Sequence, residues 1–345
     1  MKVLVTGHHG YIGSVLAPYL ADAGLDVTGL DTGFYRGCDF IAEPVSVAGL
    51  TADVRDVTVA ELEGFDAIVH LAALSNDPLG DLDPSLTKDI NGEGTLHLAR
   101  TAREAGVRRF VFASSCSMYG ASGTDDALDE TAPLRPLTAY AESKVRAEEG
   151  LAELAAPDFV PVSMRNATVF GVSPRLRLDI VLNNLAAWAH TTGRIRLLSD
   201  GTAWRPLVHV RDVAKAALAM LEAPEDRVRA EAFNVGTDEQ NYLVRELAEV
   251  LAQVTGCEIE IAEGSAADSR SYRVDFSKLV RVFPDLSLEW NAERGARELV
   301  DAYREVGLTS DDFEGNRYIR LRRLRSLIDQ GKLNDELRWQ SAVAA

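Results

Sequence analysis

Short runs rich in apolar residues alternate with longer amphipathic segments through the first half of this chain. The runs, which predict buried strands, lie at 3–6, 27–30, 67–71, 110–113 and 160–164. The segments with apolar residues three and four positions apart, which predict helices, lie at 11–23, 84–105 and 138–155. Apolar strands that alternate with helices predict a doubly wound α/β fold of the Rossmann type, in which helices cover both faces of a parallel sheet.

The alternation becomes less regular after about residue 165. Helical patterns recur at 179–191, 211–222 and 242–255, with short strands predicted at 195–198, 206–210, 231–235 and 258–262. We therefore expect a Rossmann domain over residues 1–170 and a smaller C-terminal lobe over 171–345, from which the chain could cross back into the sheet. A second ligand would bind in the cleft between them. The arginine-rich tail from 316 to 339 predicts a surface helix that carries salt bridges.

Charge and composition exclude several classes of partner. The chain has 53 acidic and 36 basic residues, a net charge of −17, which argues against binding to nucleic acid or to an anionic membrane surface. No stretch is long and apolar enough to predict a membrane span, and polar residues interrupt the N-terminal apolar run. The three cysteines are scattered, without the spacing of a disulfide framework or a metal site. We expect a cytoplasmic protein without a metal ion.

Three glycines directly after the first predicted strand carry the strongest signal for a ligand. Gly7, Gly10 and Gly13 are spaced three apart, and a predicted helix follows them. The first permits a tight turn, the second lets the backbone approach a pyrophosphate, and the third lets the helix pack against the sheet. The helix N-terminus would then present unpaired N–H groups to the phosphates. The strand, turn and helix in this order predict a dinucleotide-binding site.

Two acids follow at the ends of the next strands. Asp31 ends the second strand, where a carboxylate accepts hydrogen bonds from a ribose diol and would repel a 2′-phosphate. This favours NAD over NADP, although the nearby Arg36 keeps NADP as a minor alternative. The alternative role of Asp31 is to cap the turn that follows the strand. Asp53 is expected to close the third strand, where it could accept a hydrogen bond from an adenine amino group.

A serine, a tyrosine and a lysine form the candidate catalytic group. Tyr140 and Lys144 are four residues apart in a predicted helix and therefore share one face. A neighbouring ammonium favours the phenolate form of tyrosine, and this makes the phenol usable as a base near neutral pH. Ser115 directly follows the predicted strand 110–113, where its hydroxyl could relay a proton between a substrate and Tyr140.

These residues resemble the extended short-chain dehydrogenase/reductase family, in the group of NAD-dependent nucleotide-sugar epimerases and dehydratases. The likeness extends from the glycines through 70–74, 165–171, 204–210, 233–236 and 268–278, and so covers roughly residues 1–305. The resemblance implies bound NAD, an NDP-sugar substrate, and a homodimer formed through the helices at about 84–105 and 138–155. It implies cofactor contacts from Gly7, Gly10, Tyr11, Ile12, Gly13, Asp31, Asp53, Val54, Leu71, Ala72, Ala73, Tyr140 and Lys144.

The same resemblance supplies candidates for binding the nucleotide sugar. These are Ser75, Ser117, Tyr119, Thr168, Asn184, Arg205 and Arg270. The two arginines suit a diphosphate, because a guanidinium matches phosphate oxygens in a bidentate manner. Salt bridges with Asp212 and Asp268 are their alternative roles. Asn183 is the alternative to Asn184.

The chain also departs from the family pattern in ways that narrow the reaction. The 4,6-dehydratases of the family carry Asp-Glu directly after the catalytic threonine, but this chain has Cys116-Ser117, which disfavours dehydration. Some relatives use a cysteine as an acid or base one position away from Cys116. A one-residue offset on a strand turns the side chain to the opposite face, so we expect Cys116 to be a packed residue. Thr168 replaces the family's usual asparagine. We expect an NDP-sugar 4-epimerase, with an NAD(P)H-dependent ketoreductase or an enolising C3/C5 epimerase as alternatives.

Overall fold

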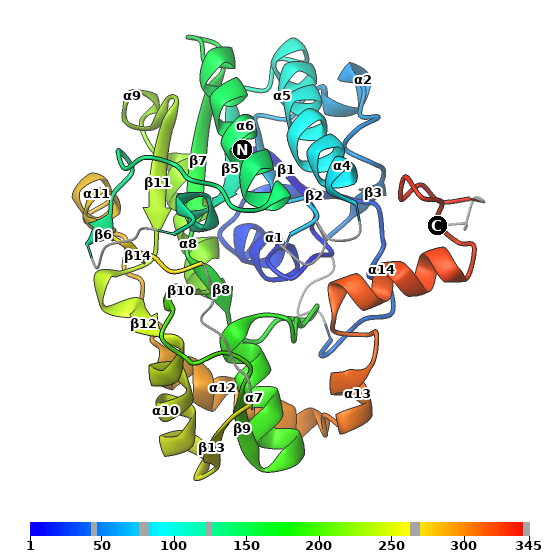
Figure 1. Ribbon diagram of the computed structural model, residues 1–345. Helices are drawn as coiled ribbons and strands as arrows, with labels where there is room; N and C mark the ends of the chain where they lie inside the picture. Colours follow the sequence, from blue (N-terminus) through cyan, green and yellow to red (C-terminus); the bar gives the residue numbers. More distant parts are fainter. Residues whose placement is uncertain (43–46, 76–82, 122–125, 263–269, 341–345) are drawn as a thin grey trace.

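A computed structural model describes residues 1–42, 47–75, 83–121, 126–262 and 270–340 of the 345-residue chain. Its centre is a seven-stranded parallel sheet, with helices on both faces (Figure 1). The strand order across the sheet is β11-β7-β5-β4-β1-β2-β3. The bounds are β1 (Lys2–Thr6), β2 (Asp26–Asp31), β3 (Gly49–Thr51), β4 (Ala67–His70), β5 (Arg109–Ser115), β7 (Val160–Asn166) and β11 (Glu231–Val235). This confirms the doubly wound Rossmann-type fold.

The direction of strand addition reverses between β1 and β4, which pair with each other in parallel. From β1 the chain adds β2 and β3 on one side, and then β4, β5 and β7 on the other. Ligands of such sheets bind in the crevice outside the carboxyl ends of the strands at this reversal. Gly7 comes directly after β1 and Leu71 directly after β4, so both segments lie at this point.

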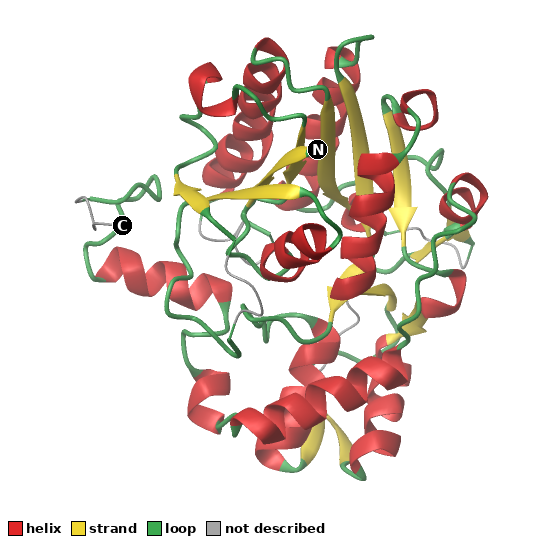
Figure 2. Cartoon of the chain, turned by 180° about the vertical axis from the view of Figure 1, so that it is seen from behind, coloured by secondary structure: helices red, strands yellow, loops and turns green. Residues whose placement is uncertain are grey.

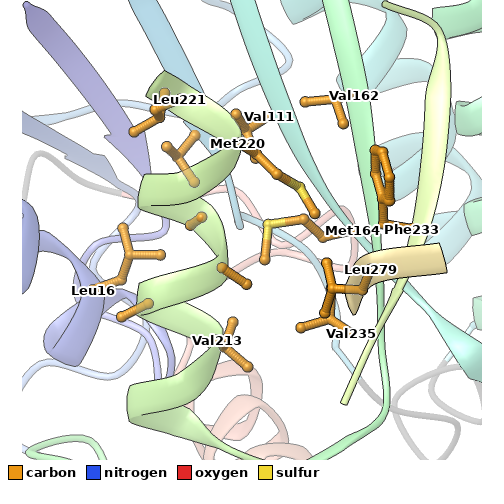
Figure 3. Packing of buried hydrophobic residues seen from close by; sticks show 14 of the residues in the cluster. Leu16, Val111, Val162, Met164, Val213, Met220, Leu221, Phe233, Val235 and Leu279 are labelled. Carbon is orange, nitrogen blue, oxygen red and sulfur yellow. The ribbon is translucent and has the colours of Figure 1, made fainter. Parts of the chain in front are cut away.

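Two sets of helices cover the sheet. On one face α1 (Gly13–Asp22) and α8 (Val210–Glu222) pack side by side, as Figure 2 shows from behind. Figure 3 shows Val213, Met220 and Leu221 of α8 facing apolar side chains of β5, β7 and β11. The opposite face carries α2 (Val59–Leu62), α4 (Pro84–Thr87), the π-helical turn η1 (Lys88–Glu93), α5 (Gly94–Glu104) and α6 (Ala139–Leu154). The predicted helix 84–105 is therefore one continuous helical region with a π-helical turn inside it.

The second lobe packs beneath the carboxyl edge of the sheet (Figure 1). Its three-stranded sheet joins β8 (Thr168–Phe170), β10 (Trp204–His209) and β12 (Asn241–Leu243), and its paired strands are β9 (Arg194–Leu197) with β13 (Glu258–Ile261) and β6 (Ala127–Leu128) with β14 (Arg273–Val274). Its longer helices are α7 (Val181–Thr192), α10 (Val244–Thr255) and α12 (Ala292–Val306). Each of these three ends at a glycine in the left-handed conformation, which satisfies the last carbonyls of the helix. The shorter helices are η2 (Cys116–Tyr119), α9 (Glu225–Val228), η3 (Asp238–Gln240), α11 (Ser277–Val282), α13 (Ser310–Glu314) and α14 (Arg320–Asp329).

Two features differ from a simple division at residue 170. Strand β11 crosses back into the large sheet beside β7, and α8 returns to cover that sheet. The arginine-rich tail forms the helix α14 at the surface, where Arg322 and Arg325 are exposed. In α14 the side chains of Arg320, Leu324 and Leu327 are buried, because the helix packs against the Rossmann domain. No helix among the described residues is long and apolar enough to cross a membrane.

Candidate active site

Two adjoining cavities lie at the carboxyl edge of the sheet. The larger, of about 740 Å³, lies between the sheet and the second lobe, and the smaller, of about 120 Å³, lies beside the glycine turn. Both are lined by Tyr11, Ile12, Leu71, Ala73, Ser75 and Arg177. A ligand in the smaller cavity can therefore contact a second ligand in the larger one.

The glycine turn fits closely around its own backbone. Gly7 has a φ of +72°, and a Cβ there would lie 2.8 Å from the backbone nitrogen of Ala72. A Cβ on Gly13 would lie only 2.1 Å from the carbonyl oxygen of Gly7. The turn thus requires glycine and leaves backbone facing the smaller cavity at the start of α1. A helix N-terminus with bare backbone beside it is a site for an anion such as a pyrophosphate.

Every cofactor residue predicted from the sequence lines one of the two cavities. Tyr140 and Lys144 line the larger cavity, and the other eleven line the smaller. The residues present therefore fit NAD. Among the described residues no group of three His, Cys, Asp or Glu side chains could hold a metal ion.

The two predicted acids already have partners. The Asp31 carboxylate accepts from the backbone nitrogens of Gly33 at 2.7 Å and His9 at 3.1 Å, so it also caps the turn after β2. A carboxylate offers about four acceptor positions, so Asp31 can still accept from a ribose.

Asp53 is held more completely. Oδ1 accepts from the backbone nitrogen and Nε of Arg55, and Oδ2 accepts from the Arg55 guanidinium at 2.7 Å and pairs with Arg338 at 3.1 Å. Burial would raise the pKa of Asp53, but the hydrogen bonds and charge of Arg55, with the charge of Arg338, lower it. An adenine amino group would have to displace one of these bonds. Asp53 also lies two residues beyond the end of β3 and does not close that strand.

Ser115, Tyr140 and Lys144 converge on the larger cavity from two elements. Ser115 ends β5, and its Oγ accepts from the backbone nitrogen of Ser117 at 3.1 Å. Tyr140 and Lys144 lie one turn apart near the start of α6, whose first turn is capped by Thr138. The lysine Nζ donates to the carbonyl oxygen of Ala113 at 2.7 Å and lies 5.7 Å from the centre of the Tyr140 ring.

Burial lowers the pKa of the two basic side chains near Tyr140, Lys144 and His70. Lys144 is 3% exposed, and its burial lowers its pKa to about 7, while the carboxylate of Glu148 acts to raise it. His70 is fully enclosed between the hydroxyls of Thr6 and Thr95, and burial lowers its pKa to about 3. Since His70 is uncharged at neutral pH, Lys144 is the one of these two residues that can place a positive charge beside Tyr140 in its protonated form.

Six of the seven predicted substrate residues line the larger cavity. They are Ser75, Ser117, Thr168, Asn184, Arg205 and Arg270. Asn183 is instead buried and bonds to the backbone of Arg177 and Gly171. Arg205 donates to the carbonyl oxygen of Arg270, which brings the two arginines side by side. Asp212, the alternative partner of Arg205, accepts from the backbone nitrogen of Trp290. Asp268, the alternative partner of Arg270, lies outside the described residues.

Tyr119, which was expected to contact the substrate, lines neither cavity. The 3₁₀ turn η2 directs it into the protein, where its side chain is 1% exposed. Its hydroxyl donates to Asn234 at 2.8 Å and accepts from Arg165 at 3.1 Å. Cys116 is fully buried, as the strand offset predicts, and burial raises the pKa of its thiol well above the usual value.

Sequence reasoning missed three charged residues of the cavity wall, Arg177, Asp179 and Arg196. Arg177 lines both cavities, pairs with Asp179 through Nε at 2.9 Å and donates to the Ser75 hydroxyl at 3.0 Å. The arginine-rich loop 171–178 was visible in the sequence, but its composition does not show which arginine faces the cavity. Among the described residues, the charged side chains that line the larger cavity are one acid, Asp179, and five basic residues: Lys144, Arg177, Arg196, Arg205 and Arg270. This basic lining, in a chain of net charge −17, suits an anionic ligand.

Comparison with known proteins agrees with this geometry. Residues 3–236 match the sequence model of the NAD dependent epimerase/dehydratase family. The chain belongs to this family, which confirms the resemblance and the expectation of an NAD-dependent enzyme.

Relatives with a named activity are similar over most of their length. The UDP-glucose 4-epimerase of Bacillus subtilis is 28% identical over 88% of this chain and 96% of the relative. That of Corynebacterium glutamicum is 31% identical over 78% of this chain and 85% of the relative. Among solved structures, MoeE5 in complex with UDP-glucuronic acid and NAD has a TM-score of 0.76 at 29% identity, over 88% of this chain and 99% of that one. The NAD complex of UDP-glucose 4-epimerase from Thermus thermophilus has a TM-score of 0.73 at 28% identity, with the same coverage.

Proposed function

We propose that this protein is an NAD-dependent epimerase of nucleotide sugars that acts at C4. The observation that carries the proposal is the position of Ser115, Tyr140 and Lys144 on the larger, basic cavity, next to the dinucleotide cavity. Relatives named UDP-glucose 4-epimerase support the choice of reaction and of substrate class.

When bound, NAD supplies an acceptor and donor for the hydride of a sugar carbon. Tyr140 acts as the base that takes the proton of the C4 hydroxyl, and it returns that proton when the alcohol re-forms. Ser115 donates a hydrogen bond to the same sugar oxygen and orients it toward the phenol. The Lys144 ammonium stabilises the phenolate, since a nearby opposite charge favours the ionised form.

The remaining lining residues hold the substrate. Arg205 and Arg270 bind the diphosphate, because guanidinium groups match phosphate oxygens. Ser75, Ser117, Thr168 and Asn184 provide neutral hydrogen-bonding groups for the sugar, and Ser117 Oγ is a buried hydroxyl without a partner among the described residues. Epimerisation requires the 4-ketosugar to present its other face, and short neutral side chains permit this rotation.

The residues after the catalytic serine argue against dehydration. Elimination of water needs an acid and a base beside the sugar, which the family's dehydratases supply as Asp-Glu. Here Cys116 is buried away from the cavity, and Ser117 offers a hydroxyl with no carboxyl group.

We further propose a cytoplasmic homodimer that pairs through the region 84–105 and α6. The two lie next to each other on one side of the sheet (Figure 1), where Arg146 pairs with Glu93 and Lys88 pairs with Glu142 at 3.4 Å. Light scattering of the purified protein at several concentrations should give twice the 37.5 kDa chain mass, and a monomer at all of them would refute the dimer.

Incubation with a panel of UDP-, dTDP-, GDP- and CDP-hexoses tests the function. The proposal predicts formation of the C4 epimer of one of them without any added cofactor. Turnover that depends on added NAD(P)H would point to a ketoreductase. Uptake of solvent deuterium at C3 or C5 would point to an enolising epimerase. Either result would overturn the proposal.

A further inference from the structure

The last described part of the chain, residues 317–340, lies against the dinucleotide cavity from outside. We call it the C-terminal strap. It contains α14 and a turn closed by a bridge between Leu333 and Trp339. Figure 1 shows it beside β3 and α4. Strand β3 forms one edge of the seven-stranded sheet, and Asp53 follows it in the chain. It lies beyond the residues that match the family model.

The strap buries apolar side chains against the cavity wall. Leu324, Leu327, Leu333 and Leu337 form one buried cluster with Phe34, Leu74, Leu86 and Ile90. Phe34, Leu74 and Ile90 also line the smaller cavity. Three wall residues therefore have the cavity on one side and the strap on the other.

Polar groups of the strap hold the turn after Asp31. The indole nitrogen of Trp339 donates to the carbonyl oxygen of Thr32 at 2.8 Å, and its ring lies 6.0 Å from that of Phe34. Arg323 donates to the carbonyl oxygens of Phe34 at 3.2 Å and Arg36 at 3.0 Å. Within the turn itself, the backbone nitrogens of Arg36 and Cys38 donate to the carbonyl oxygens of Gly33 at 3.2 Å and Tyr35 at 3.1 Å.

The strap also fixes the second acid and the aromatic wall. Arg338 pairs with Asp53 at 3.1 Å, and Arg55, the main partner of Asp53, donates to the carbonyl oxygen of Glu336 at 3.1 Å. Arg320, which is 2% exposed, stacks its guanidinium 4.0 Å from the centre of the Tyr35 ring. Tyr35 lines the smaller cavity as well.

We infer that the C-terminal strap is a positioning part of the cofactor site, which keeps the dinucleotide bound between turnovers. Among the described residues that line the smaller cavity none comes from the strap, so it acts through the wall residues it holds. A loop fixed before binding loses less conformational entropy when the ligand arrives, and this tightens binding. The inference rests on the proposed function, because an epimerase reuses one bound NAD whereas a reductase must exchange it.

Two neighbouring arginines of α14 offer a matched comparison. Arg323 holds the turn after Asp31, whereas Arg325, two residues further, is exposed. Arg323→Ala and Trp339→Phe are the test variants, and Arg325→Ala is the control. Trp339→Phe keeps an aromatic ring but removes the N–H donor. All three leave the buried leucines in place, so the melting temperature of the cofactor-free variants should stay within a few degrees of that of the native chain.

The first readout is NAD binding, which does not require sugar turnover. The NAD content of the purified protein and the dissociation constant of NAD for the stripped protein are measured for each variant. Arg323→Ala and Trp339→Phe should each raise the dissociation constant by about tenfold, with Arg325→Ala unchanged. Values for both test variants that match the control would overturn the inference.

The second readout separates positioning from chemistry. With the sugar that the native chain turns over, the two test variants should need added NAD and regain the native kcat at saturating NAD. A kcat that stays low at saturating NAD would contradict a positioning role. If the native chain binds NAD but epimerises no sugar, the proposed function fails while the binding comparison still decides the role of the strap.

Discussion

The Nζ atom of Lys144 lies 5.7 Å from the centre of the Tyr140 ring. The two residues are one turn apart on α6, and the lysine is fixed by the carbonyl oxygen of Ala113 and by the Phe112 ring, 4.5 Å from its Nζ. Burial lowers the pKa of Lys144 to about 7, so placing its charge here costs folding free energy. This cost is understandable if the charge serves to stabilise the phenolate of Tyr140.

Replacing Tyr140 with Phe should remove the proton acceptor and leave the cavity intact. We expect kcat for epimerisation to fall roughly 10²–10⁴-fold, the usual contribution of a positioned acid–base group. NAD binding should change little. Steady-state kinetics and NAD titration of the variant check both statements. A Tyr140→Phe enzyme that keeps its native kcat would contradict the assigned role.

Replacing Lys144 with Met should stabilise the cofactor-free chain while abolishing activity. Met fills similar space without a charge to desolvate, and we expect a gain of roughly 1–4 kcal/mol in the free energy of unfolding at pH 7. Urea denaturation of both proteins measures it. A clear loss of stability in the variant would show that the contacts of Lys144 outweigh the cost of its burial.

The difference in the free energy of unfolding between the native chain and Lys144→Met should depend on pH, because Lys144 titrates. Between pH 7 and 10.5 the unfolded chain keeps the proton of Lys144 and the folded chain has released it. The native chain therefore gains stability as the pH rises through this window. The advantage of the Met variant should shrink between pH 7 and pH 9, and an advantage that grows would refute the assigned burial.

Acid should destabilise the protein through His70. Its pKa is lowered from 6.5 to about 3 by burial, so the unfolded chain takes up a proton before the folded chain does. The stability contributed by this neutral imidazole is complete above pH 6.5 and is lost as the pH falls toward 3. A His70→Gln variant should lose less stability than the native chain between pH 6.5 and 4.5, by roughly 2–3 kcal/mol. If the free energy of unfolding falls equally with pH in the two proteins, His70 is not responsible for the loss of stability in acid.

Replacing Tyr119 with Phe separates substrate binding from internal structure. The change removes a buried hydroxyl and leaves Arg165 and Asn234 each without one partner. We expect a loss of about 1–3 kcal/mol in the free energy of unfolding. The KM for the nucleotide sugar should stay near its native value. A large rise in KM without loss of stability would place Tyr119 at the substrate after all.

Local pattern was enough to predict the sheet and the cofactor turn. The glycines must be glycine because the turn after β1 leaves no room for a Cβ, and that constraint is visible as a spacing. The position of Ser115 at a strand end, and of Tyr140 and Lys144 on one helix face, follows from regular geometry alone.

The misplaced residues depend on long-range packing or on irregular backbone. Tyr119 was a candidate through the family resemblance, but the 3₁₀ turn η2 directs its side chain inward, and a matching motif does not show that direction. Arg177 lines both cavities, and its guanidinium donates to Asp179 and to Ser75, which lies 102 residues earlier in the sequence. The arginines of α14 predicted a surface helix, but they do not show which surface its interspersed leucines cover. That surface surrounds Phe34, which lies 289 residues before Arg323 in the sequence.

The most direct measurement uses a nucleotide hexose that carries deuterium at C4, incubated with the purified protein in ordinary water and without added cofactor. If the hydride leaves and returns within one active site, NMR should find the C4 epimer with the deuterium still at C4. Product with hydrogen at C4, or no product until NAD(P)H is added, would contradict the account.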